Sequence, residues 1–540
     1  MPSLTPSFWG WGYAERFPDE AALRALAERV AALLGIAPPP PRPAPRIEGA
    51  TLPASRLGVP ASLSPFCDAT AEARVRHAYG KSFRDQVRGF AGDFRGAPDL
   101  VALPRSEDDV ARTLEWASRE SVAVVPFGGG TSVTGGVEPD VGSGYRGALS
   151  LDVRRLAGIV EVDAVSRAAR IQAGATGPAI EAGLARHGLT LRHYPQSFEH
   201  STLGGWIATR AGGHFATLTT RIDDLVESVR MLTPSGPWET RRLPASGAGP
   251  SPDRLVLGSE GALGVITEAW VRVQARPRFR ASASLHFETF ERGAEAVRAV
   301  VQSGLHPANC RLLDPAEAAL HAVAADGHAV LLLEFESADH ALGAWIERAV
   351  AIAEAHGARC RSGPLLRDEG DGGARGAESS SWRSAFLAAP YLHSALVSLG
   401  LVADTFETAC TWDRFPALHG AVMERVGEAL RQACGAGLLT CRLTHVYPDG
   451  PAPYYTFLAP GRAGAELDQW AQVKREAADA IAAQGGTITH HHAVGRMHAP
   501  WYARERPDAF SRALGAVKSA LDPAWILNPG VLVERAEVGT

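Results

Sequence analysis

The sequence contains very little lysine, cysteine and asparagine. Lys81, Lys474 and Lys518 are the only lysines among 54 basic residues, and asparagine occurs twice. An arginine excess of this kind is typical of coding bias. The six cysteines form no C-x-x-C pair and no regular framework, which argues for reduced thiols in a cytosolic setting. The net charge is −5, so a general attraction to nucleic acid is excluded.

Long apolar runs are also missing. No stretch of 18 apolar residues is free of polar side chains, and residues 1–13 lack the basic and apolar regions of a signal peptide. We therefore expect a cytoplasmic protein with at most a peripheral membrane association. Hydrophobic residues make up 46% and charged residues 21%, as in globular proteins, and 540 residues predict two or three domains.

The order of apolar patterns divides the chain. Apolar residues at helical spacing predict a helix at 19–34, and the proline-rich run 38–45 must end it. From Asp99 short apolar strands alternate with helices, and beyond Arg276 longer strands and helices predict a second α+β unit. Residues 363–381, rich in glycine, serine and acidic residues, predict a mobile surface loop. The predicted division is a helical segment at 1–94, a first domain at 95–275, a second domain at 276–485 and a C-terminal return at 486–540.

A glycine-rich segment follows the apolar strand that begins at Val122. It reads "VVPFGGGTSVTGG" from Val124 and holds five glycines between Gly128 and Gly136. Such a loop lets backbone N–H groups surround one anion, because glycine has no Cβ and accepts positive φ. It lacks the Lys-Ser/Thr pair of a Walker loop. It also lacks the third glycine of a dinucleotide fingerprint, because Val133 stands at that position. Alone, it does not separate a phosphate cradle from an ordinary loop.

Three later segments combine small residues with hydroxyl groups. They are "YPQSFEHSTLGGWIATRAGG" from Tyr194, "RIDDLVESVRMLTPSG" from Arg221 and "LGSEGALGVITEAWVRV" from Leu257. With the first loop, and in this order, they resemble the FAD-binding domain of the vanillyl-alcohol oxidase superfamily. The resemblance implies an FAD cofactor and an α+β fold, in which a two-subdomain FAD-binding domain carries an α+β cap with an antiparallel sheet. No histidine or cysteine beside the first loop could easily hold flavin covalently, so we expect non-covalent FAD.

The same resemblance implies which residues bind the cofactor. In that superfamily the FAD pyrophosphate lies against the first loop. The implied positions are Pro126, Phe127, Gly128, Gly129, Gly130, Thr131 and Ser132; Gln196, Ser197, Glu199, Ser201, Thr202, Thr209, Arg210, Ala211 and Gly212; and Glu260, Gly261, Ala262, Gly264, Val265 and Ile266.

A run of three histidines is the most unusual local composition. It lies in "TITHHHAVGRMHAPWY", which begins at Thr487. In an extended segment His490 and His492 would face one way and His491 the other. No H-E-x-x-H motif or matched cysteine or carboxylate spacing accompanies the run, so no metal is predicted, and a structural cluster is a second interpretation. Because imidazole titrates near neutral pH, proton transfer or substrate binding is favoured.

Further motifs narrow the resemblance to one family. "FWGWGY" at 8–13, "FET" before "WDR" at 406–414, "CRLTHVY" before "YYTF" at 441–457, "HHHAVGR" at 490–496 and "LDPAWILNPG" at 521–530 are similar to motifs of the alkyldihydroxyacetonephosphate synthases. Those enzymes exchange the acyl chain of acyl-dihydroxyacetone phosphate for a fatty alcohol, through a flavin N5 adduct and with no net redox change. The resemblance implies an FAD-dependent alkyl transferase of ether lipid synthesis. It also implies that Tyr454 transfers a proton beside the active-site triplet His490, His491 and His492.

Substrate binding is expected of four residues, with one departure from the family. Arg311 matches an active-site arginine, and Arg442 lies in the matching motif "CRLTHVY". Glu407 and Arg414 keep the family's motif without a certain role. Where the family has an arginine in a "PYLR"-like motif, this chain has His393. A protonated histidine can bind phosphate, but it lacks the permanent charge and the bidentate geometry of arginine.

Other interpretations stay open. Relatives with the same FAD domain oxidise 2-hydroxy acids, so an FAD-dependent oxidase or dehydrogenase of the D-lactate or glycolate type is the alternative. Intact Tyr454 and the histidine triplet disfavour a flavoprotein without chemistry. The expected partners are a lipid or hydroxy-acid substrate and a second copy of the chain in a homodimer, with no nucleic acid. The apolar stretches 385–403 and 452–460 predict a hydrophobic tunnel, a membrane-docking surface or ordinary core.

Overall fold

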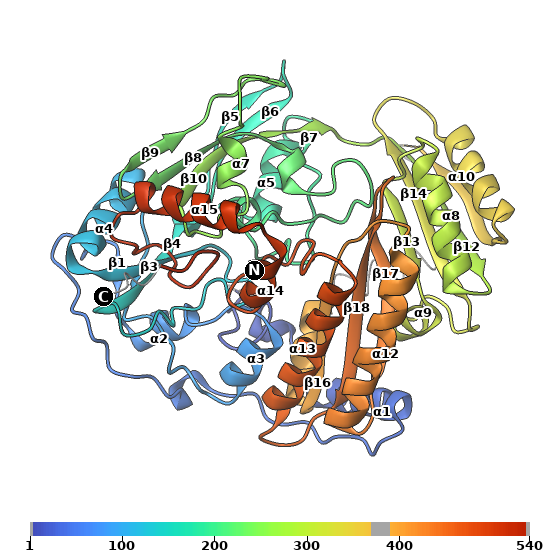
Figure 1. The fold of residues 1–540 in the computed structure, drawn as a ribbon, viewed down its shortest axis with the longest axis horizontal. Coiled ribbons are helices and arrows are strands. Elements are labelled where there is room, and N and C mark those ends of the chain that lie inside the picture. Colours follow the sequence, from blue (N-terminus) through green and yellow to red (C-terminus); the bar gives the residue numbers. More distant parts are fainter. Residues whose placement is uncertain (1–3, 369–388, 536–540) are drawn as a thin grey trace.

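The computed structural model describes residues 4–368 and 389–535. The chain forms two halves that lie side by side (Figure 1). One half holds a four-stranded and a five-stranded sheet from residues before 276, and the other is built on one antiparallel sheet of seven strands. This arrangement confirms the predicted α+β fold of a two-sheet domain with a cap.

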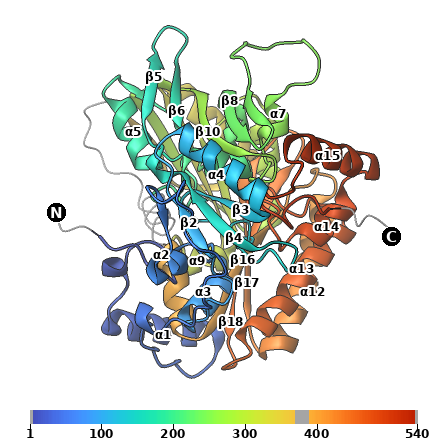
Figure 2. The same ribbon diagram turned by 90° about the vertical axis from the view of Figure 1, so that its left-hand side faces the viewer.

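The first sheet has the order β1-β2-β4-β3, and β2, β4 and β3 run parallel. Strands β3 and β4 consist mainly of buried apolar residues, as expected for strands covered on both faces. Helix α4 connects β2 to β3; Ser106 caps it by accepting the N–H of Asp109. Figure 2 shows α4 lying across this sheet. The bounds are β1 (Cys67–Asp68), α2 (Ala71–Arg76), α3 (Phe83–Phe90), β2 (Leu100–Ala102), α4 (Glu107–Glu120), β3 (Val122–Phe127) and β4 (Gly147–Asp152).

The second sheet is antiparallel, in the order β5-β6-β10-β8-β9. Helix α6 packs on β6 and β10 and buries Trp206 and Ile207. Thr202 caps α6 by accepting the N–H of Gly205, and the Thr202 side chain also lies against Gly128 of the glycine-rich loop. The bounds are β5 (Ile159–Asp163), β6 (Ala168–Gln172), α5 (Gly177–Ala185), β7 (Leu189–Thr190), α6 (Leu203–Thr209), β8 (Val226–Thr233), β9 (Gly236–Glu239), α7 (Asp253–Val256), β10 (Val265–Arg272) and β11 (Gln274–Ala275), which pairs with β7.

The cap sheet has the order β15-β12-β14-β13-β17-β18-β16. Helices α8, α10, α12 and α13 share one core with alternate residues of its strands, including Leu312 and Tyr455. Because side chains alternate along a strand, Arg311 and Tyr454 point to the other face, toward the first half. The bounds are β12 (Phe279–Phe287), α8 (Phe290–Gln302), β13 (Asn309–Leu313), α9 (Pro315–Leu320), β14 (Ala329–Ser337), α10 (Gly343–Ala355), β15 (Arg359–Arg367), β16 (Leu401–Glu407), α12 (Phe415–Cys434), β17 (Leu438–Val446), β18 (Pro451–Pro460) and α13 (Glu466–Ala483).

At the two ends of the described chain, the N-terminal helix packs on the cap and the C-terminal segment pairs with the first half. Helix α1 (Glu20–Leu34) packs on the apolar residues of 395–403, and Asp19 caps it. After α14 (Ala499–Glu505) and α15 (Asp508–Leu521) the chain returns to β3, where the N–H of Val124 donates to Ile526 O (2.8 Å) and the N–H of Asn528 donates to Val124 O (2.8 Å). In Figure 1 the red helix α15 accordingly lies over the first half.

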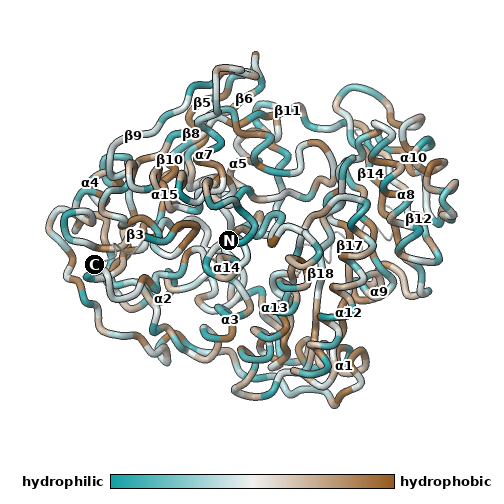
Figure 3. Tube along the Cα trace, in the orientation of Figure 1, coloured by the Kyte–Doolittle hydropathy of each residue, from teal (hydrophilic) through white to brown (hydrophobic). Residues whose placement is uncertain are grey.

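One sequence expectation about the surface is wrong in part. Residues 363–367, expected in a loop, belong to β15, in which Leu365, Leu366 and Arg367 pair with Ser282, Ala281 and Arg280 of β12. Residues 369–381 of that expected loop lie outside the described residues. Among the described residues, no helix is long and apolar enough to cross a membrane, and Figure 3 shows hydrophobic stretches interrupted throughout the trace.

Candidate active site

A cavity of about 310 Å³ lies between the two halves. Its wall on the first half is formed by the glycine-rich loop and by the segments on either side of α6. Its wall on the cap is formed by the open face of β13, β16, β17 and β18 and by the histidine run. Of the predicted residues, it is lined by Gly128, Gly129, Gly130, Thr131, Ser132, Gln196, Ser197, Ser201, Thr202, Thr209, Ala211, Gly212, Arg311, His393, Arg442, Tyr454, His491 and His492.

The glycines of the first loop are required by close packing. A Cβ on Gly129 would lie 1.9 Å from the carbonyl oxygen of His200, and one on Gly128 would lie 2.4 Å from Thr202 Oγ1. Gly130 has φ +64°, a conformation that favours glycine. The loop therefore lies directly on the segment before α6 and presents backbone to the cavity.

The charges that line the cavity suit an anionic cofactor. Among the described lining residues, Asp404 is the one carboxylate, and Trp470 Nε1 donates to it (2.7 Å) while Lys474 pairs with it (3.4 Å). Lys81, Arg311 and Arg442 supply positive charge. A glycine cradle without a free carboxylate fits a pyrophosphate, which the backbone N–H groups of such a loop bind well.

Ten predicted cofactor positions do not line the cavity. Glu260 accepts the N–H of Val494 (2.9 Å) and of Gly495 (2.8 Å), and its burial raises the pKa of its carboxyl to about 7. The turn at 260–266 therefore holds the segment after the histidines. Glu199, another of these positions, pairs with Arg16 at the surface. The ten are Pro126, Phe127, Glu199, Arg210, Glu260, Gly261, Ala262, Gly264, Val265 and Ile266.

Glu407, at the end of β16, anchors the histidine run. Its Oε1 accepts the backbone N–H groups of His490 (3.1 Å), His491 (2.7 Å) and His492 (2.6 Å), and the hydroxyl of Thr489 (2.9 Å). Its Oε2 forms an ion pair with His491 Nδ1. Burial opposes ionisation, but the charges of His491 and His492 hold the pKa of Glu407 well below its usual range. Glu407 does not line the cavity, so it holds the histidines in place.

The three imidazoles are not distributed as in an extended strand. The run is irregular, because three successive N–H groups converge on one carboxylate, so the expected alternation of faces is wrong. His491 and His492 lie against the ring of Tyr454, with centroids 6.0 and 5.4 Å away. His490 turns away from the cavity, and its Nε2 bonds the hydroxyl of Tyr447 (2.8 Å).

Tyr454 lies on β18 at the centre of the cap wall. Its hydroxyl donates to Thr405 Oγ1 (2.9 Å), and the guanidinium carbon of Arg442 lies 4.0 Å from its ring centroid. Burial raises the pKa of Tyr454 to about 12, although Arg442 and Thr405 act in the opposite direction. Arg442 forms an ion pair with buried Glu317 of α9, whose pKa it holds at about 2 against the effect of burial.

Two further predicted residues line the same wall. Arg311 is fully buried, and its Nη2 donates to the carbonyl of His214 (3.3 Å); burial, with the charge of Arg442, lowers its pKa to about 9. His393 Nε2 donates to Ala403 O (2.6 Å), and its Nδ1 accepts from Gln86 Nε2 (2.5 Å). Burial lowers the pKa of His393, so the ring is held neutral with both nitrogens engaged.

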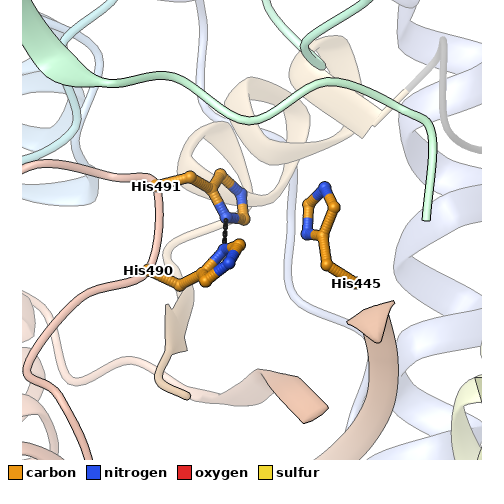
Figure 4. Close-up of side chains that lie close together, drawn as sticks. All are labelled: His445, His490 and His491. Atoms are coloured by element: carbon orange, nitrogen blue, oxygen red, sulfur yellow. Dashed lines mark hydrogen bonds between the residues drawn. The ribbon is translucent and has the colours of Figure 1, made fainter. Parts of the chain in front are cut away.

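The structure adds residues that the sequence did not single out. His445 of β17 lies beside His490 and His491, with ring centroids 4.9 and 5.3 Å away (Figure 4). Lys81 lines the cavity next to the glycine loop, where its backbone N–H donates to Ser132 O (2.6 Å). In the sequence, the feature that could have pointed to His445 is its place in the motif "CRLTHVY". It directly follows Thr444, and both residues line the cavity.

Comparison with known proteins defines the class. A model of an FAD binding domain matches residues 98–240, and a model of the C-terminal domain of FAD linked oxidases matches residues 276–532. A solved structure of p-cresol methylhydroxylase with substrate bound shares the fold, with a TM-score of 0.68 at 13% identity, over 89% of this chain and 96% of that chain. The protein is a flavoprotein of the FAD-linked oxidase type, and its cofactor is FAD.

More similar proteins define the family. Alkyldihydroxyacetonephosphate synthase of Dictyostelium discoideum is 31% identical over 85% of this chain and 77% of that protein; the Trypanosoma brucei brucei enzyme is 30% identical over 86% and 78%. A solved structure of alkyldihydroxyacetonephosphate synthase has a TM-score of 0.79 at 25% identity, over 97% of this chain and 98% of that chain. The chain belongs to the alkyldihydroxyacetonephosphate synthase family, which confirms the resemblance found in the sequence.

Proposed function

We propose that the protein is an FAD-dependent alkyl transferase, which exchanges the acyl chain of an acyl-dihydroxyacetone phosphate for a fatty alcohol. The observation that supports this most strongly is that one cavity joins the glycine loop to Tyr454, His491, His492 and Arg442. The relatives named for glycolate oxidation and D-lactate dehydrogenation are less similar, at 27% and 25% identity. The transferase is therefore favoured over the oxidation of a 2-hydroxy acid.

The chain's own residues provide the proton transfers that such an exchange needs. A proton must leave the carbon that bears the ester, and Tyr454 Oη is the base that we assign to it. Burial raises the pKa of Tyr454 to about 12, and the guanidinium of Arg442 and the hydroxyl of Thr405 favour the phenolate form against it. The rings of His491 and His492, held by Glu407, lie beside the ring of Tyr454, with centroids 6.0 and 5.4 Å away, and we assign to them the onward transfer of that proton to the departing carboxylate. Bound FAD would supply the electron sink beside this carbon.

The remaining lining residues fit a lipid phosphate. Apolar side chains from both predicted apolar stretches form one wall, and a long alkyl chain gains about 0.8 kcal/mol for each CH₂ that it buries there. The phosphate would be held by the cations that line the cavity, since His393 is neutral and fully bonded within the protein. Lys81 and Arg311 are the cations that we assign to it. The apolar wall consists of Pro390, Leu392, Leu396, Ala403, Phe457 and Leu458.

One purified sample tests this assignment with two assays. The protein is incubated with palmitoyl-dihydroxyacetone phosphate and hexadecanol, and released palmitate and ether product are measured by mass spectrometry. In parallel, D-lactate and glycolate are offered with an artificial electron acceptor. We expect ether product without reduction of the acceptor. Reduction by a hydroxy acid, with no ether product, would overturn the proposal in favour of the oxidase.

We also propose that FAD is held non-covalently and that the protein acts as a homodimer with peripheral membrane contact. Acid precipitation should release the flavin into the supernatant. Sedimentation analysis of the holoprotein, with and without vesicles of neutral phospholipid, should show a dimer that partly associates with the vesicles. Flavin that stays with the precipitate, a monomer, or unchanged sedimentation with vesicles would each contradict the corresponding part.

A further inference from the structure

Three imidazoles converge at the end of the cavity in a way that the proton-transfer scheme does not explain. Figure 4 shows the ring of His445 facing the rings of His490 and His491. One ring nitrogen from each lies within 4.8 Å of the other two. His445 comes from β17 and the other two from the anchored run, so two separate elements build the cluster.

The hydrogen bonds fix which nitrogen of His445 faces inward. Its Nε2 bonds the carbonyl of Gly213 (2.9 Å), so Nε2 carries the proton and Nδ1 carries the lone pair. His445 is 1% exposed, and within the described part of the chain its buried Nδ1 has no hydrogen-bond partner. A buried acceptor that is left without a partner costs about 1–3 kcal/mol. The fold therefore maintains an inward lone pair that needs a ligand.

Of the other two histidines, His490 has the same arrangement of an outer partner and an inner nitrogen: its Nε2 bonds the hydroxyl of Tyr447, which also bonds Thr220 Oγ1 (2.9 Å). His491 differs, because Glu407 pairs with its Nδ1, the same nitrogen that faces His490. Metal-bound histidines are commonly oriented by an outer partner, as His445 and His490 are here. The Nδ1 atoms of His490 and His491 lie 3.0 Å apart. This contact is a hydrogen bond, and an ion bound there would replace its proton. Two nitrogens on one tetrahedral zinc lie about 3.4 Å apart, so the rings would move apart only slightly.

We propose that His445, His490 and His491 bind one divalent transition-metal ion of the zinc type. With the ion bound, His492 is the imidazole that remains to move the proton. Imidazole nitrogens suit zinc, and three protein ligands leave a fourth position for an oxygen ligand. His445 and His491 line the cavity, so that position faces the substrate space. The ion would hold an oxygen atom of the substrate where His393 offers no charge. The sequence spacing does not predict this site, because His445 lies far upstream of the histidine run.

Cobalt binding tests the site without any assay of turnover. Untagged FAD-loaded protein is dialysed against a chelator and titrated with Co²⁺, whose tetrahedral absorption bands lie at longer wavelengths than those of oxidised flavin. We expect one Co²⁺ per chain with a tetrahedral spectrum. His445→Gln keeps an N–H that can donate to Gly213 and removes the ligand, so it should weaken Co²⁺ binding at least tenfold. Failure of the transferase assay would leave this result unaffected.

A second histidine group provides the matched control. His286 of β12, with Asp326 and His328 just before β14, also lies in a group close enough together to hold a metal. His286→Gln should leave tetrahedral Co²⁺ binding unchanged. Binding that is lost in His286→Gln and kept in His445→Gln, or no binding at all, would overturn the proposal. X-ray absorption at the cobalt edge of the wild-type protein needs no variant: three imidazole ligands support the site, and one or none refutes it.

Discussion

The two walls of the cavity are formed by different kinds of chemical group. The wall on the first half consists of backbone and small residues, because Gly128 and Gly129 lie in contact with the segment before α6. The cap wall carries ionisable side chains, among them Tyr454, Arg442 and His491, each held by a partner within the cap. The first wall suits the binding of a cofactor, and the second suits the movement of protons. Changes in the two walls should therefore have separable effects.

The largest effect is expected from a change in the backbone wall. A methyl group on Gly129 would lie 1.9 Å from the carbonyl of His200, so Gly129→Ala must displace the loop or that segment. We expect loss of bound flavin and, with it, of all activity, measured by the flavin absorbance of the purified protein. Gly144→Ala is the control, since its added methyl meets nothing within 4 Å. Normal flavin content in Gly129→Ala would show that the loop does not contact the cofactor.

The next largest effect is expected from the cap wall with flavin retained. Tyr454→Phe removes the hydroxyl assigned to proton transfer, and we expect turnover to fall by about 10²–10⁴-fold. Tyr455→Phe is a matched control, because the neighbouring hydroxyl faces the helices and bonds His419 Nδ1 (3.2 Å). That control should cost about 1 kcal/mol of stability and leave turnover unchanged. Equal turnover in the two variants would refute the assignment of Tyr454.

A smaller effect is expected from the anchor of the histidine run. Glu407→Gln keeps one oxygen for the backbone N–H groups but removes the charge opposite His491. Hydrogen bonds to charged groups are worth about 1.5–3 kcal/mol, so we expect kcat to fall by about ten- to a hundredfold, with a small change in KM. The pH profile of kcat should also shift, because His491 loses its counter-charge. A change in KM alone would instead indicate that Glu407 binds the substrate.

The smallest effect is expected in the acid stability of the first half. Burial lowers the pKa of His193 to about 3, below about 6.5 in the unfolded chain, so only the unfolded state takes up a proton between these values. Its contribution to stability is present above pH 6.5 and is lost as the pH falls. In His193→Gln the slope of unfolding free energy against pH, from denaturant titrations, should decrease by about 1.4 kcal/mol per pH unit. His187→Gln, at an exposed position, should leave the slope unchanged; an unchanged slope in His193→Gln would refute the assignment.

The same difference between the walls explains what the sequence could predict. The glycine-rich loop itself is visible in the sequence, since close backbone approach requires glycine, but only the resemblance assigned that loop and the segment of α6 to the cofactor. The cap wall was predictable only by resemblance, because Arg311, Arg442 and Tyr454 meet through the pairing of β13, β17 and β18. The anchoring role of Glu407 and the place of His445 depend on contacts between distant segments. The limits of the domains and the roles of the site residues stay predictions.

The central claim is that the two walls together carry out a transfer with no net redox change. It is tested most directly under anaerobic conditions, with holoprotein, palmitoyl-dihydroxyacetone phosphate and hexadecanol, and without any electron acceptor. We predict many turnovers, with palmitate and ether product formed in a ratio of one to one and the flavin oxidised at the end. Flavin that is bleached after a single turnover, or a reaction that needs an acceptor to continue, would contradict the account.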